Sequence, residues 1–340
     1  MTDILSLMPE ELKQQISDLG LPAYRSKQIS EWLTRGCRDF SEMTNLPKTL
    51  REVLQEHFEL YAPKMLRQQI SREDGTKKFL WGLVDGNSVE TVFMRYHYGN
   101  SVCISSQVGC RQGCSFCAST IGGLVRNLTP GEMINEVLFT EQAAGDRVSN
   151  IVLMGIGEPL DNLENVLRFL HLISHSEGRN IGLRHITLST CGLPEGIERL
   201  AEEKLPITLA LSLHAPEDAL RSRIMPSNRG IDKVMRACRH YVDQTGRRIS
   251  FEYSMIRETN DSTQQAAELA GLAKSIGAHV NLIPLNYVEE RGMLPSTPET
   301  IRAFQKVLED SGVTVSVRRR LGSDIDASCG QLRRKFQKHV

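Results

Sequence analysis

The sequence of 340 residues lacks any apolar run that approaches membrane-spanning length, although 40% of its residues are hydrophobic. Its first residues also lack a basic stretch followed by an apolar one, as a secretory signal would have. We therefore expect a cytoplasmic protein with no membrane partner. The apolar content is sufficient to fill the core of one large domain with smaller attachments.

Cysteine is sparse: the chain has eight, too few and too scattered for a disulfide framework. There is no excess charge of either sign, because Lys and Arg number 41 and Asp and Glu also number 41. The total therefore does not indicate a nucleic-acid partner. The C-terminal segment is different, since it is rich in Arg and Lys from Arg318 onward and has only Asp324 and Asp326 as acids. Such a tail either neutralises phosphates or is a solvated helix face, and charge alone does not separate the two.

Three of the cysteines stand close together, as Cys110, Cys114 and Cys117. Three thiolates at this spacing can bind three irons of a 4Fe-4S cluster and leave the fourth iron open. An open iron can bind S-adenosylmethionine and reduce it by one electron, which produces a 5′-deoxyadenosyl radical. Structural zinc is the alternative, but zinc needs four ligands, usually in two pairs, and the sequence has no second CxxC pair. The pattern therefore favours radical chemistry.

Strand-like and helix-like segments alternate from residue 101 onward. The strand-like segments cover 101–105, 150–154, 185–189, 207–213, 249–255, 280–285 and 313–317. Helical patterns lie between them, for example over 132–143 and 263–276. This alternation predicts a parallel sheet in an α/β fold, barrel-like or doubly wound, with chemistry at the carboxyl ends of the strands.

Smaller parts are expected on both sides of this core. Apolar residues at helical spacing predict a small helical unit over 1–65. Strand patterns around the turn at residues 85–87 predict a β-hairpin linker over 66–100. The core then covers 101–320, and 321–340 is expected to form a C-terminal loop with the basic tail.

Small or polar residues follow several of the predicted strands. The second strand leads into a Gly-Ile-Gly-Glu-Pro turn at 155–159, where a glutamate can meet a ligand ammonium group. Polar side chains also follow later strands, in the segments 188–192, 211–216 and 284–286. An ordinary tight turn and a structural role for His214 are the plain alternatives. The repetition at successive strand ends favours a ring of ligand-binding groups.

Five segments together resemble the RlmN/Cfr family of radical-SAM RNA adenine methyltransferases. They are 103–110, 114–117, 155–159, 211–216 and 324–332, in the family's order. The resemblance runs through nearly the whole chain, and the housekeeping branch that modifies adenine C2 is the more similar one. It implies an α/β fold that is a partial (β/α)6-type radical-SAM barrel, with a small helical accessory domain that binds RNA and a C-terminal extension.

The resemblance also implies a mechanism. One S-adenosylmethionine methylates a cysteine, here Cys329, by nucleophilic displacement. The radical from a second S-adenosylmethionine removes a hydrogen from the S-methyl group, and the resulting methylene radical adds to the adenine carbon. The ring then loses a proton, and the resemblance implies Glu90 as the group that accepts it. The alternative is that Glu90 is only an exposed residue of the hairpin. Attack by the Cys103 thiolate on the Cys329 sulfur releases the RNA and leaves a disulfide. For an isolated cysteine the plainer explanation is that Cys103 is a small, buried hydrophobic residue.

The ligands follow from the same resemblance. One 4Fe-4S cluster is held by Cys110, Cys114 and Cys117, and two S-adenosylmethionine molecules are used per turnover. Gly157 and Glu158 are placed at the amino group of S-adenosylmethionine. The residues placed around the rest of it are Ser189, Ser212, Leu213, His214 and Asn286. The other three cysteines, Cys37, Cys191 and Cys238, match no role and are expected to be packing residues.

The implied partners are 23S rRNA, tRNA and an external, flavodoxin-like electron donor, and a monomer is the simplest state. RNA contacts are expected from the helical unit, with Arg25, Lys27 and Lys48, and from the Arg-rich tail. Both would hold phosphates while the target base enters the mouth of the barrel.

Three functions remain open on the sequence. The first is methylation of adenosine C2 in 23S rRNA at adenine 2503 and in tRNA at adenine 37. The second is C8 methylation of the same rRNA adenosine, as in the antibiotic-resistance branch, which shares both catalytic cysteines and the cluster. The third is a non-catalytic, metal-containing RNA-binding protein, against which the presence of both Cys103 and Cys329 argues. Overall similarity, for example over 122–128 and 284–287, favours the first.

Overall fold

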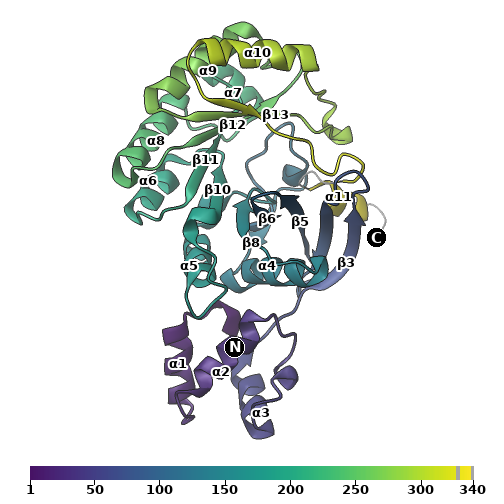
Figure 1. The fold of residues 1–340 in the computed structure, drawn as a ribbon, viewed down its shortest axis with the longest axis vertical. Helices are drawn as coiled ribbons and strands as arrows, with labels where there is room; N and C mark the ends of the chain where they lie inside the picture. Colours follow the sequence, from purple (N-terminus) through teal and green to yellow (C-terminus); the bar gives the residue numbers. More distant parts are fainter. Residues whose placement is uncertain (327–329, 338–340) are drawn as a thin grey trace.

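The structure, a computed structural model, describes residues 1–326 and 330–337. Its main feature is a ten-stranded sheet with the strand order β14-β13-β12-β11-β10-β9-β6-β5-β4-β3. Figure 1 shows this sheet curving, with helices along its outer face and the N-terminal helices below it. The curved, open sheet with its outer helices confirms the expected partial barrel.

The core of the sheet is built from seven parallel strands. They are β6 (Gly99–Cys103), β9 (Asn150–Leu153), β10 (Ile186–Thr190), β11 (Thr208–Ser212), β12 (Ser250–Met255), β13 (His279–Pro284) and β14 (Val315–Val317). All seven predicted strands are confirmed. The central strands are buried on both faces, as Leu209, Ala210 and Leu211 of β11 show, and this is why their sequences are almost continuously apolar.

Helices connect these strands and cover the outer face of the sheet. They are α4 (Pro130–Ala144), α5 (Leu163–Ser174), α6 (Pro194–Glu202), α7 (Asp218–Ile224), α8 (Ile231–Thr245), α9 (Thr263–Ile276) and α10 (Pro298–Asp310). The predicted helices over 132–143 and 263–276 are confirmed as α4 and α9. Each begins at a capping box, formed by Thr129 and Glu132 in α4, and each ends at a left-handed glycine. Short 3-10 turns fill other connections: η3 (Ala118–Thr120), η4 (Pro159–Asn162), η5 (Leu183–His185) and η6 (Glu289–Arg291).

Three antiparallel strands extend the sheet beyond β6. They are β3 (Lys64–Ile70), β4 (Lys77–Gly82) and β5 (Ser88–Tyr96), and β5 pairs directly with β6. The hairpin of β4 and β5 was expected, whereas β3 was not. It is the edge strand, and most of its side chains are solvent-exposed, so its sequence lacks the apolar alternation by which strands are identified. A separate two-stranded sheet, β7 (Gln107–Gly109) and β8 (Leu124–Asn127), lies between β6 and α4 in the chain.

The expected N-terminal helical unit is present. It contains α1 (Pro9–Asp18), α2 (Arg25–Thr34) and α3 (Lys48–His57), with η1 (Ile4–Ser6), η2 (Phe40–Glu42) and the short parallel pair β1 (Thr2–Asp3) and β2 (Phe58–Glu59). Its apolar side chains belong to the same hydrophobic core as those of the sheet. None of the helices in the described part of the chain combines the length and the apolar character that a membrane span requires.

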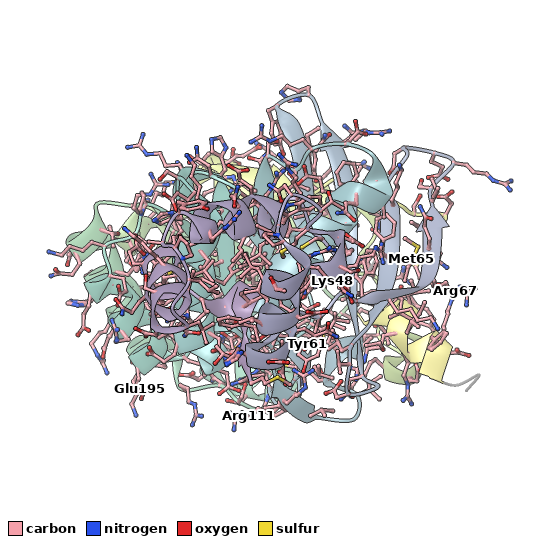
Figure 2. The ribbon with its side chains drawn as sticks, turned by 90° about the horizontal axis from the view of Figure 1, so that it is seen from below. Lys48, Tyr61, Met65, Arg67, Arg111 and Glu195 are labelled. Atoms are coloured by element: carbon pink, nitrogen blue, oxygen red, sulfur yellow. The ribbon has the colours of Figure 1, made fainter. Side chains whose placement is uncertain are left out.

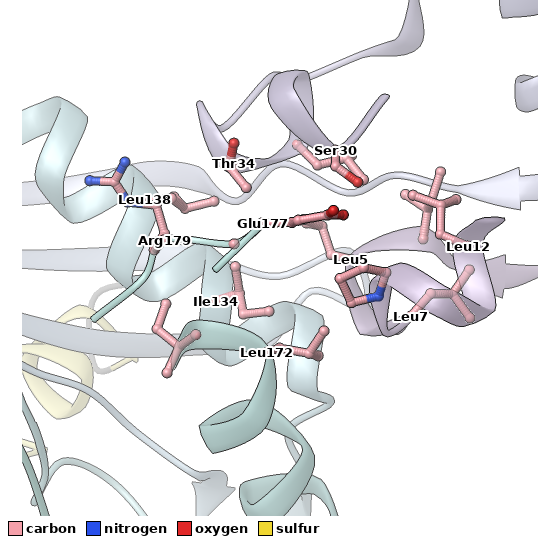
Figure 3. A pocket seen from close by; sticks show the side chains of 15 residues that line it. Leu5, Leu7, Leu12, Ser30, Thr34, Ile134, Leu138, Leu172, Glu177 and Arg179 are labelled. Carbon is pink, nitrogen blue, oxygen red and sulfur yellow. The ribbon is translucent and has the colours of Figure 1, made fainter. Parts of the chain in front are cut away.

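Polar contacts attach this unit to the core. Arg168 of α5 donates to the Ser6 carbonyl at 2.6 Å and pairs with Glu11 of α1. The Asp3 carboxylate accepts from Ser6 Oγ at 2.6 Å and from Thr129 Oγ1, at the start of α4, at 3.3 Å. A small cavity of about 60 Å³ remains between α1, α2, α4 and α5, and Figure 3 shows that its walls are mainly aliphatic. None of the candidate site residues lines this cavity.

The contact between Asp3 and α4 gives a test of this attachment. Gly131 lies in the first turn of α4, and a Cβ there would lie 2.9 Å from Asp3 Cγ. We expect Gly131→Ala to lower the thermal unfolding midpoint, because Asp3 must move and its hydrogen bonds are lost at a cost of about 1 kcal/mol or more. Gly271→Ala is the matched control, since Gly271 lies within α9 with nothing within 4 Å of the added methyl group. It should stabilise the protein by up to about 1 kcal/mol. Circular dichroism measures both, and equal midpoints for the two variants would contradict this account.

Candidate active site

The loop that carries the three clustered cysteines is held at both of its ends. It begins after β7, where the Cys110 amide donates to the Gly123 carbonyl at 3.0 Å. Gly109 has a φ of 80°, and a Cβ there would overlap the Gly123 carbonyl, so glycine is required. At the other end, Thr120 Oγ1 donates to the carbonyls of Cys114 and Cys117 at 3.1 and 3.0 Å. The backbone of the loop is therefore fixed.

The side chains of Cys110, Cys114 and Cys117 line one cavity of about 260 Å³, at the carboxyl ends of the parallel strands. Burial raises the pKa of the Cys110 thiol to about 12 and raises that of Cys114 as well. Both thiols therefore stay protonated until a metal displaces their protons. Among the described residues, no three His, Cys, Asp or Glu side chains are close enough to share one metal ion. In a 4Fe-4S cluster each cysteine binds a different iron, so the three thiols need only face the same space. Cys110, Cys114 and Cys117 meet this requirement.

The turn that follows β9 packs closely against residues 104–107, which lead into the cluster loop. A Cβ on Gly155 would lie 2.5 Å from the Ile104 carbonyl oxygen, and one on Gly157 would lie 2.7 Å from Gln107 Cβ. The buried Glu158 carboxylate accepts from the Cys191 amide at 2.7 Å and from an amide of its own turn at 3.1 Å. Burial raises the pKa of Glu158. This carboxylate therefore ties the end of β9 to the end of β10 in the wall of the cavity.

Most of the other predicted S-adenosylmethionine residues line the same cavity. Ser189 and Ser212, at the ends of β10 and β11, are joined by a hydrogen bond of 3.1 Å, and Asn286 follows β13. Leu213 is the exception, because its side chain is fully buried and is not part of the lining. The sequence pattern places Leu213 beside the cavity, but it cannot tell which of two neighbouring side chains faces inward.

His214 lies in the wall of this cavity as a neutral imidazole. It adopts a left-handed backbone conformation with a φ of 58°, and its Nδ1 accepts from the Ser254 amide at 3.0 Å. Its ring meets Phe116 of the cluster loop edge to face, with centroids 5.0 Å apart. Burial lowers the pKa of His214 to about 3. The remaining nitrogen, Nε2, therefore carries a hydrogen that a ligand acceptor could use.

A second, larger cavity of about 370 Å³ adjoins the first. The residues that line both are Met154, Ile283, Asn286 and Arg318. Cys103, which is buried at the end of β6, lies in the wall of the second cavity, together with the three arginines at 318–320. The cavity of the three clustered thiols therefore opens toward Cys103 and a positively charged surface.

One face of β5 connects Cys103 to the C-terminal segment. Side chains on the same face of a strand are two residues apart, and paired residues on neighbouring strands share a face. Lys78 of β4 pairs with Val92 of β5, and Val92 pairs with Cys103 of β6, so these three form a row. Glu90 stands two residues before Val92 and lies on the same face.

Glu90 is buried and paired, so the alternative of an exposed hairpin position is wrong. Its carboxylate lies 2.9 Å from Lys78 Nζ, and both side chains are almost inaccessible to solvent. Glu90 also accepts from the Gly330 amide at 2.7 Å and from the Arg333 amide at 2.5 Å, while Lys78 donates to the Asp326 carbonyl at 2.5 Å. The pair thus holds the chain on both sides of 327–329. The predicted methyl carrier, Cys329, lies outside the described residues.

Lys78 is the site residue that the sequence analysis missed. It stands inside β4, between Lys77 and Phe79, at a position where strand alternation places an inward-facing residue. A lysine within a strand that is otherwise buried was the available signal, because burial of an ammonium group requires a partner. Without the tertiary structure, that partner could not be named.

The remaining predicted residues lie away from the two cavities or pack around them. Cys37 and Cys238 are buried, as expected. Cys191 is buried too, although it also lines the first cavity. Lys48 is exposed on the N-terminal unit, and Figure 2 shows it on the side of the molecule seen from below.

Comparison with known proteins agrees with this geometry. Residues 104–270 match the Radical SAM superfamily, and residues 2–60 match the ribosomal RNA large subunit methyltransferase N-terminal domain. The chain is 51% identical over 338 residues to a probable dual-specificity RNA methyltransferase RlmN of Desulforamulus reducens, covering 98% of this chain and 97% of that protein. It is 49% identical over 340 residues to the protein of the same name from Clostridium botulinum, covering 99% and 98%.

A solved structure shows the same fold throughout the chain. The crystal structure of a radical SAM methyltransferase from Sphaerobacter thermophilus is 43% identical and superposes with a TM-score of 0.93. The match covers 97% of this chain and 99% of the other. This likeness confirms the radical-SAM fold that the sequence indicated, and it confirms an enzyme rather than a non-catalytic binding protein. The chain belongs to the RlmN family of radical-SAM RNA methyltransferases.

Proposed function

We propose that this protein methylates C2 of adenosine in 23S rRNA and in tRNA. The observation that supports this most directly is the junction of the two cavities. One holds three thiols suited to a cluster, and the other holds Cys103 beside three arginines that can bind phosphate. The relatives named dual-specificity RNA methyltransferase support two classes of RNA substrate.

The first cavity is the proposed cofactor site. We assign Cys110, Cys114 and Cys117 to one 4Fe-4S cluster, which when bound with S-adenosylmethionine supplies a 5′-deoxyadenosyl radical. The proposed S-adenosylmethionine residues are Gly157, Glu158, Ser189, Ser212, Leu213, His214 and Asn286. Of these, Leu213 could contribute only through its backbone, because its side chain does not reach the cavity. The glycines of the turn after β9 allow this turn to pack against residues 104–107, and Glu158 then lies in the wall of the cavity.

The second cavity is the proposed site of the target adenine. The Cys329 thiolate first attacks the methyl carbon of one S-adenosylmethionine and displaces S-adenosylhomocysteine. After hydrogen abstraction by the radical from a second molecule, the Cys329 methylene carbon bonds to the adenine carbon. The adduct gives up its unpaired electron, which the oxidised cluster would accept, and the ring carbon loses its proton. The Cys103 thiolate then attacks the Cys329 sulfur and the sulfur–methylene bond breaks, so that the released carbon takes up a proton and becomes the methyl group. A disulfide remains between the two cysteines, and an external reductant must reduce it.

Glu90 is proposed to accept the ring proton, and its contacts set a condition on that role. The Glu90 carboxylate accepts from the Gly330 and Arg333 amides and lies 2.9 Å from Lys78 Nζ, so its oxygens already have three partners. Transfer of the ring proton to Glu90 therefore competes with these contacts.

The remaining assignments complete the proposal. We propose the RNA-binding accessory domain over 1–65, the hairpin segment over 66–100, the barrel over 101–320 and the catalytic-cysteine loop with its tail over 321–340. The protein is proposed to act as a monomer in the cytoplasm, with electrons from a flavodoxin-like donor.

The nucleoside product tests the function directly. After anaerobic reconstitution with iron and sulfide, the protein should convert unmodified 23S rRNA fragment and tRNA to 2-methyladenosine when S-adenosylmethionine and a reductant are present. Mass spectrometry of the digested RNA against methyladenosine standards measures this. The appearance of 8-methyladenosine would place the activity in the antibiotic-resistance branch, and no methyladenosine from protein with an intact cluster would overturn the proposal.

Two cysteine variants test the order of the covalent steps. Cys329→Ala should abolish methyl transfer, at least a hundredfold below wild type, while the cluster absorbance remains, because Cys329 is not a proposed cluster ligand. Cys103→Ala should instead trap a covalent adduct of protein and RNA, visible as a shifted band on a denaturing gel. Cys37→Ala is the matched control, since Cys37 is equally buried but lies in the N-terminal unit. Turnover by Cys329→Ala, or free release of product by Cys103→Ala, would contradict the mechanism.

A further inference from the structure

The hairpin that joins β5 to β6 carries two stacked tyrosines. The rings of Tyr96 and Tyr98 lie 4.9 Å apart with an interplanar angle of 9°, and His97 meets Tyr98 edge to face at 5.0 Å. The turn is tight, because Tyr96 pairs with Gly99, whose φ of 128° is open only to glycine. The backbone therefore holds both rings in one parallel stack.

The two rings have different surroundings. Tyr96 is half-buried, and it lies in the wall of the second cavity on the same face of β5 as Glu90 and Val92. Tyr98 is 62% exposed and forms the outer end of the stack. A single exposed aromatic residue is common in soluble proteins. This stack begins in the wall of the proposed substrate cavity and ends in solvent. A further flat ring can therefore stack on its outer end.

The charge around this stack is positive. Arg318, Arg319 and Arg320 line the same cavity as Tyr96, and the positive charges of Arg318 and Arg319 act on the Tyr96 phenol. A ligand that offers both flat aromatic rings and negative charge fits such a surface. Single-stranded RNA has both, since its unstacked bases stack on aromatic side chains and its phosphates pair with arginine.

We propose that Tyr96 and Tyr98 form a stacking platform for a base that neighbours the target adenosine in the RNA. This inference rests on the proposed function and adds to it the residues that hold the flanking nucleotide. Extrusion of the target base breaks its stacking with its neighbours. Capture of one exposed neighbour on the Tyr98 face replaces part of the lost stacking, while the arginines hold the phosphates between the two nucleotides.

The test compares three substitutions at one exposed position. Tyr98→Ala removes the ring, and Tyr98→Leu replaces it with a side chain that has no flat face. Both should weaken the binding of an unmodified RNA hairpin about tenfold. Tyr98→Phe keeps the ring and should bind like wild type. Dissociation constants are measured by fluorescence anisotropy with the reconstituted, full-length protein. Methylation of Cys329, which requires S-adenosylmethionine but no RNA, is followed by intact-protein mass spectrometry and reports whether each variant is folded and loaded.

A second set of RNAs identifies the contact itself. The base is removed at one nucleotide at a time on each side of the target adenosine, and binding of wild type and Tyr98→Ala is compared. Wild type should bind most of these RNAs more tightly than Tyr98→Ala does. When the missing base is the one that stacks on Tyr98, the two proteins should bind the RNA equally. Equal binding of intact RNA by all four proteins would overturn the platform, as would a Tyr98→Ala defect that persists with every abasic RNA. Failure of wild type to methylate any RNA would instead overturn the proposed function, so the two failures are distinguishable.

Discussion

The parallel pairing of β6 and β9 to β13 is the constraint on which the rest of the site depends. Hydrogen bonding in register brings the carboxyl ends of these strands to one edge of the sheet, although the segments that follow them are far apart in the sequence. The cluster loop, the turn after β9 and the polar ends of β10, β11 and β13 all meet there. Glu158 reinforces this arrangement, because its carboxylate binds the Cys191 amide and so fixes two strand ends relative to each other.

The buried pair of Lys78 and Glu90 has a comparable role at the other side of the sheet. Two opposite charges out of water are tolerated only when their remaining hydrogen bonds are satisfied, and here the C-terminal segment supplies them through Asp326, Gly330 and Arg333. Loss of one partner from such a pair typically costs about 3–5 kcal/mol, because the other charge remains buried. The strands β4 and β5 and the C-terminal segment are therefore energetically dependent on each other. Figure 1 shows this segment returning from the β14 edge of the sheet to lie near β3 and β5.

These two constraints together explain why the site consists of two joined cavities. The ends of the parallel strands line the first cavity. The second lies between β5, the ends of β6 and β13, and the C-terminal segment. Cys103 stands at the boundary, since its strand β6 pairs with β9 in parallel and with β5 in antiparallel orientation. The Cys103 side chain is buried and lies in the wall of the second cavity. The stacked tyrosines continue the same face of β5 toward solvent, so a single strand connects the buried pair, the cavity wall and the exposed surface.

The order of the core strands and helices follows from sequence patterns alone, because buried parallel strands require apolar runs and the helices between them carry capping residues such as Thr129 and Ser262. The sequence also shows the three clustered cysteines, whose spacing is local. It did not indicate β3, whose side chains face solvent, nor the burial of Glu90, for which an isolated glutamate in a hairpin gives no signal. Three features depend on the tertiary structure: the pairing of Glu90 with Lys78, the inward direction of Ser212 rather than Leu213, and the junction of the two cavities. Each depends on side chains that meet from distant parts of the chain, and the pattern of a single segment contains no information about its partners.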